Sequence, residues 1–376
     1  MRHVAAPILR QALGGVVWAL LCSPAWALPL TLVSDHDAED HITIGVFLQP
    51  DLSVRLAEDS EATSRLRVRN ARLDLRGAVF ASRASYRLHF NFAPGGPELF
   101  DAWIAGRFGD GWSIRAGRDL VPHHAQWETN PATQVFPERS QLVRTWGVPS
   151  GRDAGLSLRH EGTRHAFAAG VYQGSTGASH QTLGHHLYAA RMTLALIGPH
   201  TLTEYPTQAA TTPSVVLGVA LLTALDNTWV DHSLGLTSTP AAGDVYRAVL
   251  DLRIRCAGLS LYLEAAAAHT RFQEDDAQDA ARTGLAAGVS AAWLVPALPP
   301  SVLALRWGTL DHDLARQEAA MRGHEWGASW TRLHKGTHWL SRLSYLGEFN
   351  AGAAAASPVA VRRTTHTVML DHILQY

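Results

Sequence analysis

The sequence is poor in lysine, cysteine and long apolar runs. It contains one lysine, Lys335, so 31 of its 32 lysine and arginine residues are arginines, whose planar guanidinium groups stay protonated. Beyond residue 30 there is no apolar run of about 20 residues, which excludes a bundle of membrane-spanning helices. The net charge of −1 and the hydrophobic content of 47% exclude a disordered chain and a strongly basic nucleic-acid-binding protein.

The amino terminus has the features of a bacterial export signal. Arg2 and Arg10 flank the start of the chain, and the apolar stretch at residues 14–21 is too short to span a bilayer. Ala25 and Ala27 occupy the −3 and −1 positions of a signal-peptidase site. We therefore expect cleavage after residue 27, and a retained anchor is the alternative interpretation.

Cleavage would leave the mature chain with a single cysteine. Cys22 would be removed with the signal, and it is disfavoured as a lipidation site because Leu21, rather than a small residue, precedes it. Cys256 would remain alone, so no intrachain disulfide could form.

From residue 40 onward, apolar and polar residues alternate in runs of about ten residues. In one run, Tyr86, Leu88 and Phe90 share one face, and Arg87 and His89 share the other. This period of two is typical of β-strands. We expect about sixteen strands, within a range of about fourteen to eighteen, near residues 42–56, 65–80, 84–92, 100–108, 112–119, 152–160, 164–173, 186–196, 214–223, 246–256, 259–265, 283–295, 301–309, 324–333, 337–346 and 362–376.

Alternating strands build either a soluble sandwich or a transmembrane barrel. An export signal followed by strands along the whole chain favours the barrel. We therefore expect an all-β fold, a transmembrane antiparallel β-barrel of sixteen strands. The chain also ends in an aromatic residue, Tyr376, in step with Leu370 and Leu374. We expect a signal peptide at 1–27, a short segment at 28–40 and the barrel at 41–376. An interfacial girdle of tryptophans is expected from Trp103, Trp112, Trp293, Trp307 and Trp339.

Charge indicates which face of each strand lies inward. An arginine that faces lipid at mid-depth costs about 2–4 kcal/mol, so the alternating charges of residues 247–255 are expected to line a lumen. Such a wall attracts anions, because low-dielectric walls focus the field of the guanidinium groups. The predicted pore-lining, anion-binding residues are Arg65, Arg67, Arg69, Arg72, Arg76, Arg87, Arg115, Arg191, Arg247, Arg253, Arg255 and Arg306.

The densest group of these arginines lies at residues 65–76, where the alternation changes parity. Arg65, Arg67 and Arg69 occupy odd positions, whereas Arg72 and Arg76 occupy even ones. A β-bulge at Arg69 and Asn70 would turn the whole set toward one face. A strand with a solvated charged face is the alternative interpretation.

This stretch resembles the phosphate-selective porin O and P family. The resemblance rests on the order and spacing of several blocks, and residues 65–175 carry most of it. The blocks are VRNARLDLRG at 68–77, YRLHF at 86–90, DAWI at 101–104, IRAGR at 114–118 with Pro122, FPERS at 136–140, GRDAGL at 151–156 and AFAAGVY at 166–172.

The resemblance implies a trimeric, sixteen-stranded outer-membrane channel with a loop folded into the lumen. The candidate constriction loop is residues 122–150, with Glu138, Arg139 and Arg144. Phosphate-specific members place a lysine a few residues before the Pro-Glu-Arg segment, but residues 129–135 contain none. We therefore expect a general anion preference rather than strict phosphate selectivity.

Other chemistries are weakly represented. The pairs His123–His124 and His185–His186 cannot chelate one ion from a regular strand, so we expect no metal and no cofactor. The acidic cluster at residues 274–279 is interpreted as a solvated loop, with a divalent-cation contact to lipopolysaccharide as the alternative. We expect a porin for small anionic solutes, in contact with outer-membrane lipid and lipopolysaccharide, that forms a homotrimer and binds no nucleic acid. An outer-membrane barrel enzyme or a secreted β-sandwich hydrolase is the alternative.

Overall fold

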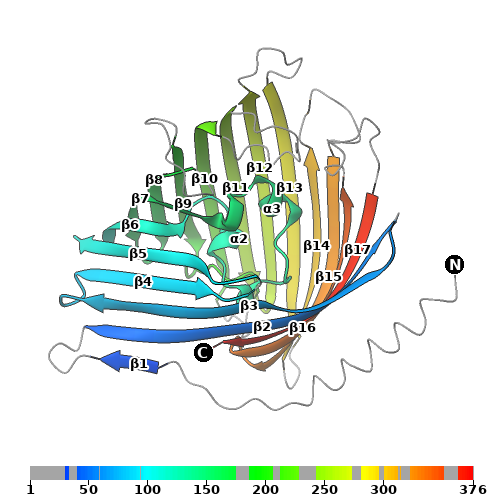
Figure 1. The fold of residues 1–376 in the computed structure, drawn as a ribbon, viewed down its shortest axis with the longest axis horizontal. Coiled ribbons are helices and arrows are strands. Elements are labelled where there is room, and N and C mark those ends of the chain that lie inside the picture. Colours follow the sequence, from blue (N-terminus) through cyan, green and yellow to red (C-terminus); the bar gives the residue numbers. More distant parts are fainter. Residues whose placement is uncertain are drawn as a thin grey trace.

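The computed structural model shows a ring of strands around an interior that contains short helices (Figure 1). The structure describes residues 30–33, 40–58, 60–93, 95–174, 186–205, 212–227, 243–272, 281–295, 300–311, 314, 322–350 and 363–375. Predictions that concern the export signal, His185, residues 274–279 and Tyr376 therefore lie outside the described residues.

Within this described part, strands β2 to β17 form one closed antiparallel barrel. Each strand pairs with its neighbours along the chain, and the pairing of β17 with β2 closes the ring. The strands are β2 His41–Ala57, β3 Thr63–Val79, β4 Ala84–Asn91, β5 Glu98–Phe108, β6 Trp112–Leu120, β7 Arg152–Glu161, β8 His165–Tyr172, β9 Leu187–Ile197, β10 Ser214–Asn227, β11 Gly243–Cys256, β12 Leu259–Phe272, β13 Ala281–Val295, β14 Ser301–Asp311, β15 Arg322–Lys335, β16 Trp339–Asn350 and β17 Arg363–Gln375.

The predicted sixteen-stranded barrel is confirmed, and the sandwich alternative is wrong because the sheet closes on itself. A short additional strand, β1 Leu30–Val33, pairs with the beginning of β2 at residues 41–44, beside the end of β17. Among the described residues, no helix is long and apolar enough to cross a bilayer.

The predicted bulge in the arginine-rich strand is confirmed. Asn70 pairs with Gln49 and Val68 pairs with Pro50, so Arg69 is an extra residue in β3 without a partner in the ladder. The bulge is what allows arginines of both parities to face the same side of the sheet.

The outer face is apolar where bulky side chains stand exposed, for example Leu66, Ile104 and Leu305. Trp112, Trp293 and Trp307 are exposed among them. Trp103 departs from the expected girdle: its ring lies 3.7 Å from the guanidinium carbon of Arg115, which faces inward with Asp119. Trp103 lies in the middle of β5 and serves as an inner contact for an arginine.

The connection between β6 and β7, residues 121–151, packs against the inner face of the opposite wall. It contains α2 Ala125–Glu128, the 3-10 turn η1 Pro131–Thr133, α3 Gln141–Trp146 and the 3-10 turn η2 Pro149–Gly151. Figure 1 shows α2 and α3 within the ring of strands. We call residues 121–151 the inward segment.

The inward segment has a hydrophobic core of its own. Its tip, with Val135 and Phe136, packs with inward Leu294, Leu333 and Leu340 of the wall. Leu142 and Trp146 of α3 pack with apolar residues of β10 to β14, most of them alanines. The inner face of β10 to β17 therefore carries apolar as well as charged side chains, because the wall there packs against the inward segment.

Candidate functional site

The inner face of β2 and β3 carries paired and unpaired arginines. Asp51 accepts hydrogen bonds from Arg67, whose Nε lies 2.9 Å away, and from the bulged Arg69 at 3.4 Å. Arg69 also bridges to the inward segment, since its Nη2 lies 2.7 Å from Glu138 Oε1. The bulge thus places one guanidinium between the wall and the segment.

The charge of Arg69 affects the protonation of Glu138. Burial raises the pKa of Glu138, but the charge of Arg69 and the hydrogen bond that it donates outweigh burial and hold the pKa below its usual value. Glu138 is therefore a carboxylate at neutral pH, and its charge is compensated locally. It should reduce anion preference less than an unpaired carboxylate would.

Beside this contact lies a polar cavity of about 220 Å³ between the inward segment and the wall. Its charged lining is unbalanced, because five arginines face two carboxylates. Of these carboxylates, Asp74 is bound by Arg87 and Glu128 by Arg191. We call this space the arginine cavity; its arginines are Arg72, Arg76, Arg87, Arg139 and Arg152.

Three of these arginines, Arg72, Arg76 and Arg139, form no ion pair with any other described residue. Arg72 donates to the side-chain oxygen of Asn70, at 2.7 and 3.0 Å, and Arg139 donates to the backbone oxygen of Gln126 at 3.3 Å. Burial, followed by the positive charges of Arg152 and Arg69, lowers the pKa of Arg139. An anion in the cavity would reduce this unfavourable charge density.

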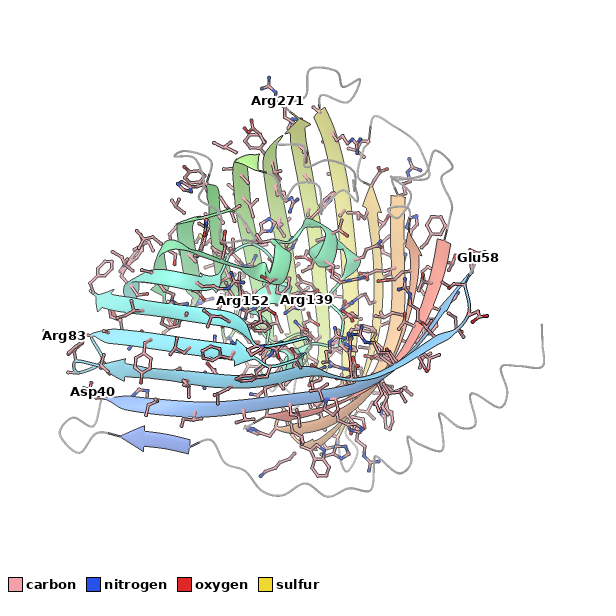
Figure 2. All side chains as sticks on the ribbon, in the orientation of Figure 1. Asp40, Glu58, Arg83, Arg139, Arg152 and Arg271 are labelled. Atoms are coloured by element: carbon pink, nitrogen blue, oxygen red, sulfur yellow. The ribbon has the colours of Figure 1, made fainter. Side chains whose placement is uncertain are left out.

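Aromatic rings hold these guanidinium groups in place. Arg72 lies 5.2 and 4.9 Å from the ring centres of Phe47 and Phe100, and Arg139 lies 3.7 Å from that of Trp127. Stacking leaves the N–H edge of a guanidinium free to donate. Figure 2 shows Arg139 and Arg152 near the middle of the molecule, away from Arg83 and Glu58 at its edges.

A second polar cavity, of about 630 Å³, follows the same wall toward the short connections. Arg76 and Arg87 line both cavities. Arg107 and Arg115 line the second cavity alone, and Arg115 is paired with Asp119 at 2.6 Å. The two cavities are therefore neighbours, and together they place arginines along β3 to β6.

On the opposite wall, the predicted arginines bind segments of the chain that fold into the barrel. Arg191 binds Asp251 at 2.7 Å and Glu128 at 3.1 Å. Arg306 donates to the backbone oxygen of Glu138 at 2.9 Å, and Arg247 donates to that of Trp146. Arg253 and Arg255 donate to backbone oxygens of Thr201 and Thr203.

The remaining predicted residues lie nearer the edge. Arg65 is exposed near the beginning of β3. Arg144, on α3, donates to Glu348 of β16 and to the backbone oxygen of Arg139. Of the predicted arginines, the structure therefore brings Arg72, Arg76, Arg87 and Arg139 together around the arginine cavity. The others bind carboxylates or inward chain, or are exposed as Arg65 is.

The histidine pair of the inward segment is buried. His124 Nδ1 lies 2.9 Å from Glu264 Oε1 on β12, and the rings of His123 and His124 are 4.3 Å apart. Burial lowers the pKa of His123 well below its usual value. Among the described residues, no group of three or more His, Cys, Asp or Glu side chains could hold a metal ion.

Sequence reasoning missed three contributors to this site. Arg152 lines the arginine cavity and binds Asp101 at 2.8 Å. Arg342 is fully buried and donates both to Asp371 and to the backbone of the inward segment at Gln134. The chain at 200–205 also folds inward. The parity of Arg342 within its strand was an available signal, whereas nothing periodic marks residues 200–205.

Comparison with known proteins supports the family resemblance predicted from the sequence. The family model described as phosphate-selective porin O and P matches residues 48–203, which confirms the resemblance predicted from residues 65–175. A search of the curated proteins finds no match.

Solved porin structures share the fold. The anion-selective porin from Comamonas acidovorans is similar with a TM-score of 0.62 and 13% identity, over 89% of this chain and 100% of that chain. A trimer form of OmpT from Vibrio cholerae is similar with a TM-score of 0.58 and 11% identity, over 89% of this chain and 99% of that chain. The outer-membrane channel DcaP of Acinetobacter baumannii is similar with a TM-score of 0.56 and 11% identity, over 92% of this chain and 99% of that chain. The chain thus carries the sequence signature of the phosphate-selective porins O and P across residues 48–203, on a closed barrel of the porin fold.

Proposed function

We propose that this protein is an outer-membrane porin, a water-filled channel for the passive diffusion of small solutes, with a preference for anions. The observation that carries the proposal is the excess of arginine over carboxylate around the arginine cavity. Fixed cations in a confined, partly desolvated passage raise the local concentration of anions and exclude cations. The similar anion-selective porin from Comamonas acidovorans supports the same preference.

The residues proposed to set this preference are Arg72 and Arg139, supported by Arg76, Arg87 and Arg152. The inward segment is proposed to be the constriction. Strict phosphate selectivity is not proposed, because residues 129–135 lack a lysine. Planar guanidinium edges can bind carboxylates as well as phosphates, so the cavity suits small oxyanions as a class.

Planar-bilayer conductance tests the proposal. Reversal potentials of the purified protein in asymmetric KCl should show chloride more permeant than potassium. Arg72→Gln combined with Arg139→Gln should reduce this permeability ratio by about tenfold, since two fixed charges act in one narrow passage. The control is Arg322→Gln, an exposed arginine paired with Asp311, which should leave the ratio unchanged. A cation-selective wild-type channel would overturn the proposal.

We further propose that the protein is exported by its amino-terminal signal, resides in the outer membrane among lipid and lipopolysaccharide, and assembles as a homotrimer. The trimer form of the similar Vibrio cholerae protein supports the assembly. Cross-linking in detergent should give a trimer band that heating converts to monomer. We propose a channel rather than a barrel enzyme, because an arginine-lined interior suits the passage of anions and needs no catalytic nucleophile.

A further inference from the structure

The connections at the two ends of the barrel differ in length. At the end where β3 meets β4, they are short: 80–83, 109–111, 162–164, 257–258, 296–300 and 336–338. The connection between β9 and β10, residues 198–213, lies at this same end and is several times longer. Its described part at 200–205 does not extend away from the barrel, because Glu204 and Tyr205 are 3% and 0% exposed.

Residues 202–205 bind the backbone of the inward segment. The Glu204 N–H donates to the backbone oxygen of Thr133 at 3.0 Å, and Glu204 Oε2 accepts from the Val135 N–H at 2.9 Å. The Tyr205 hydroxyl donates to the backbone oxygen of Ala132 at 2.5 Å. Thr129 Oγ1 donates to the backbone oxygen of Leu202 at 2.9 Å. Three backbone groups at the tip of the inward segment, the oxygens of Ala132 and Thr133 and the N–H of Val135, are thus bound by chain from the other end of the barrel.

The same residues are bound to the barrel wall. Ser260 Oγ on β12 donates to the backbone oxygen of Glu204 at 2.7 Å. On β11, Arg253 donates to the backbone oxygen of Thr201 at 3.4 Å, and Arg255 donates to that of Thr203. Residues 200–205 therefore connect a rigid sheet to the tip of a long loop.

This position is significant because the bound tip interrupts the lining of the arginine cavity. Trp127 and Thr129 line the cavity before the tip, and Arg139 lines it after the tip. A shift of residues 132–135 would therefore move both the guanidinium of Arg139 and the ring on which it stacks. A shift of about 1 Å is enough to change how charged groups in a site act on a ligand.

From these contacts we infer that residues 200–205 are a second constriction element, which enters from the short-connection end, and that Glu204 and Tyr205 are positioning residues for the selectivity of the channel. The inference rests on the proposed function. Neither side chain lines the arginine cavity; both act through the backbone of residues 132–135. The pore is then shaped by two segments that meet inside the barrel from opposite ends.

The test is the double variant Glu204→Ala with Tyr205→Phe, studied in planar bilayers beside the wild type. Loss of the two side-chain hydrogen bonds should loosen the tip, increase open-channel current noise several-fold and lower the chloride-to-potassium permeability ratio about twofold or more. A purely structural role would lower the amount of folded protein without changing the ratio of the channels that form. The control is Ser214→Ala, which removes a hydrogen bond to Pro199 within the same connection and should change neither quantity.

A cross-link provides an independent measurement. Because the Glu204 N–H donates to the backbone oxygen of Thr133 at 3.0 Å, we expect cysteines at these two positions to lie close enough for a disulfide. In a Cys256→Ala background, Thr133→Cys with Glu204→Cys should oxidise spontaneously, and reduction should increase the current noise. An anion-selective wild type whose double variant has unchanged noise and ratio would overturn this inference and leave the proposed function standing. A wild type without anion preference would overturn the proposed function itself.

Discussion

At the scale of single residues, arginine has two separate roles in this barrel. Arg342 and Asp371 form a fully buried pair, with N–O distances of 3.0 and 2.8 Å, and Arg342 also binds the inward segment. Arg72 lies in the same interior without a carboxylate partner among the described residues. The sequence places both on inward faces, but the partner of each comes from another strand, so the pattern of one strand cannot separate a structural arginine from a functional one.

The buried pair predicts a large loss of stability on truncation. Arg342→Met should lower the free energy of unfolding by about 3–5 kcal/mol, because Asp371 would keep its charge without its main partner. Urea unfolding of the barrel in detergent micelles measures the loss. Arg322→Met, at the exposed pair with Asp311, should cost about 1 kcal/mol or less. Equal losses for the two variants would contradict the structural role of the buried pair.

The buried histidine predicts how stability depends on pH. Burial lowers the pKa of His123 in the folded state, and the nearby His124, Arg247 and Arg191 act in the same direction. The unfolded chain, whose histidine has a pKa of about 6.5, then binds more protons than the folded chain. The stability that neutral His123 contributes is complete above that value and falls as the pH drops below it, by at most about 1.4 kcal/mol per pH unit.

Unfolding free energies measured from pH 7.5 to pH 5 should therefore decline in the wild type and decline less steeply in His123→Asn. His338→Asn serves as the control, because His338 is exposed whereas His123 is buried. Parallel curves for the wild type and His123→Asn would show that His123 is not the group responsible.

At the scale of elements, the strands were predictable and the interior segments were not. Strand positions follow from local alternation and from turn residues, and the bulge follows from the change of parity between Arg69 and Arg72. By contrast, the contacts of residues 132–135 with 204–205 join positions about seventy residues apart, and neither stretch has a periodic pattern. Their only local signal is length: residues 121–151 are the longest connection between two barrel strands, and residues 198–213 are much longer than the other connections at their end of the barrel.

The bulge predicts that its extra residue can be removed without a change of register. Deleting Arg69 would join Val68, which pairs with Pro50, to Asn70, which pairs with Gln49. The alternation would become regular, and Arg65 and Arg67 would still face inward. The deletion and Arg69→Ala should therefore both give the heat-sensitive folded band on gels. Loss of this band in the deletion alone would show that the extra residue is needed for the register.

At the scale of the whole molecule, the interior is divided into a filled side and an open side. A sixteen-stranded barrel is wide enough for an aqueous channel, but here the inward segment and residues 200–205 pack against β9 to β17. Both polar cavities lie over β2 to β7. Solutes should therefore pass along the arginine-bearing strands near the amino terminus, which is also where the match to the porin O and P family lies.

The two ends of the barrel also predict its orientation in the membrane. Outer-membrane barrels have short turns toward the periplasm and longer loops toward the outside. Cys256 ends β11, next to the short connection 257–258, and its thiol is free and exposed. Glu58 lies at the opposite end, after β2. A maleimide attached to a polymer too large for the pore should therefore fail to label Cys256 on intact cells.

The matched measurement uses a Cys256→Ala background that carries Glu58→Cys. Intact cells should be labelled at this position, because the connection between β2 and β3 would face the outside. After solubilisation in detergent, both cysteines should react, which excludes burial as the reason for the first result. Labelling of Cys256 on intact cells, with protection of Glu58→Cys, would reverse the orientation. Solutes from outside would then meet residues 200–205 before the inward segment, so the order in which an anion encounters the two constriction elements depends on this result.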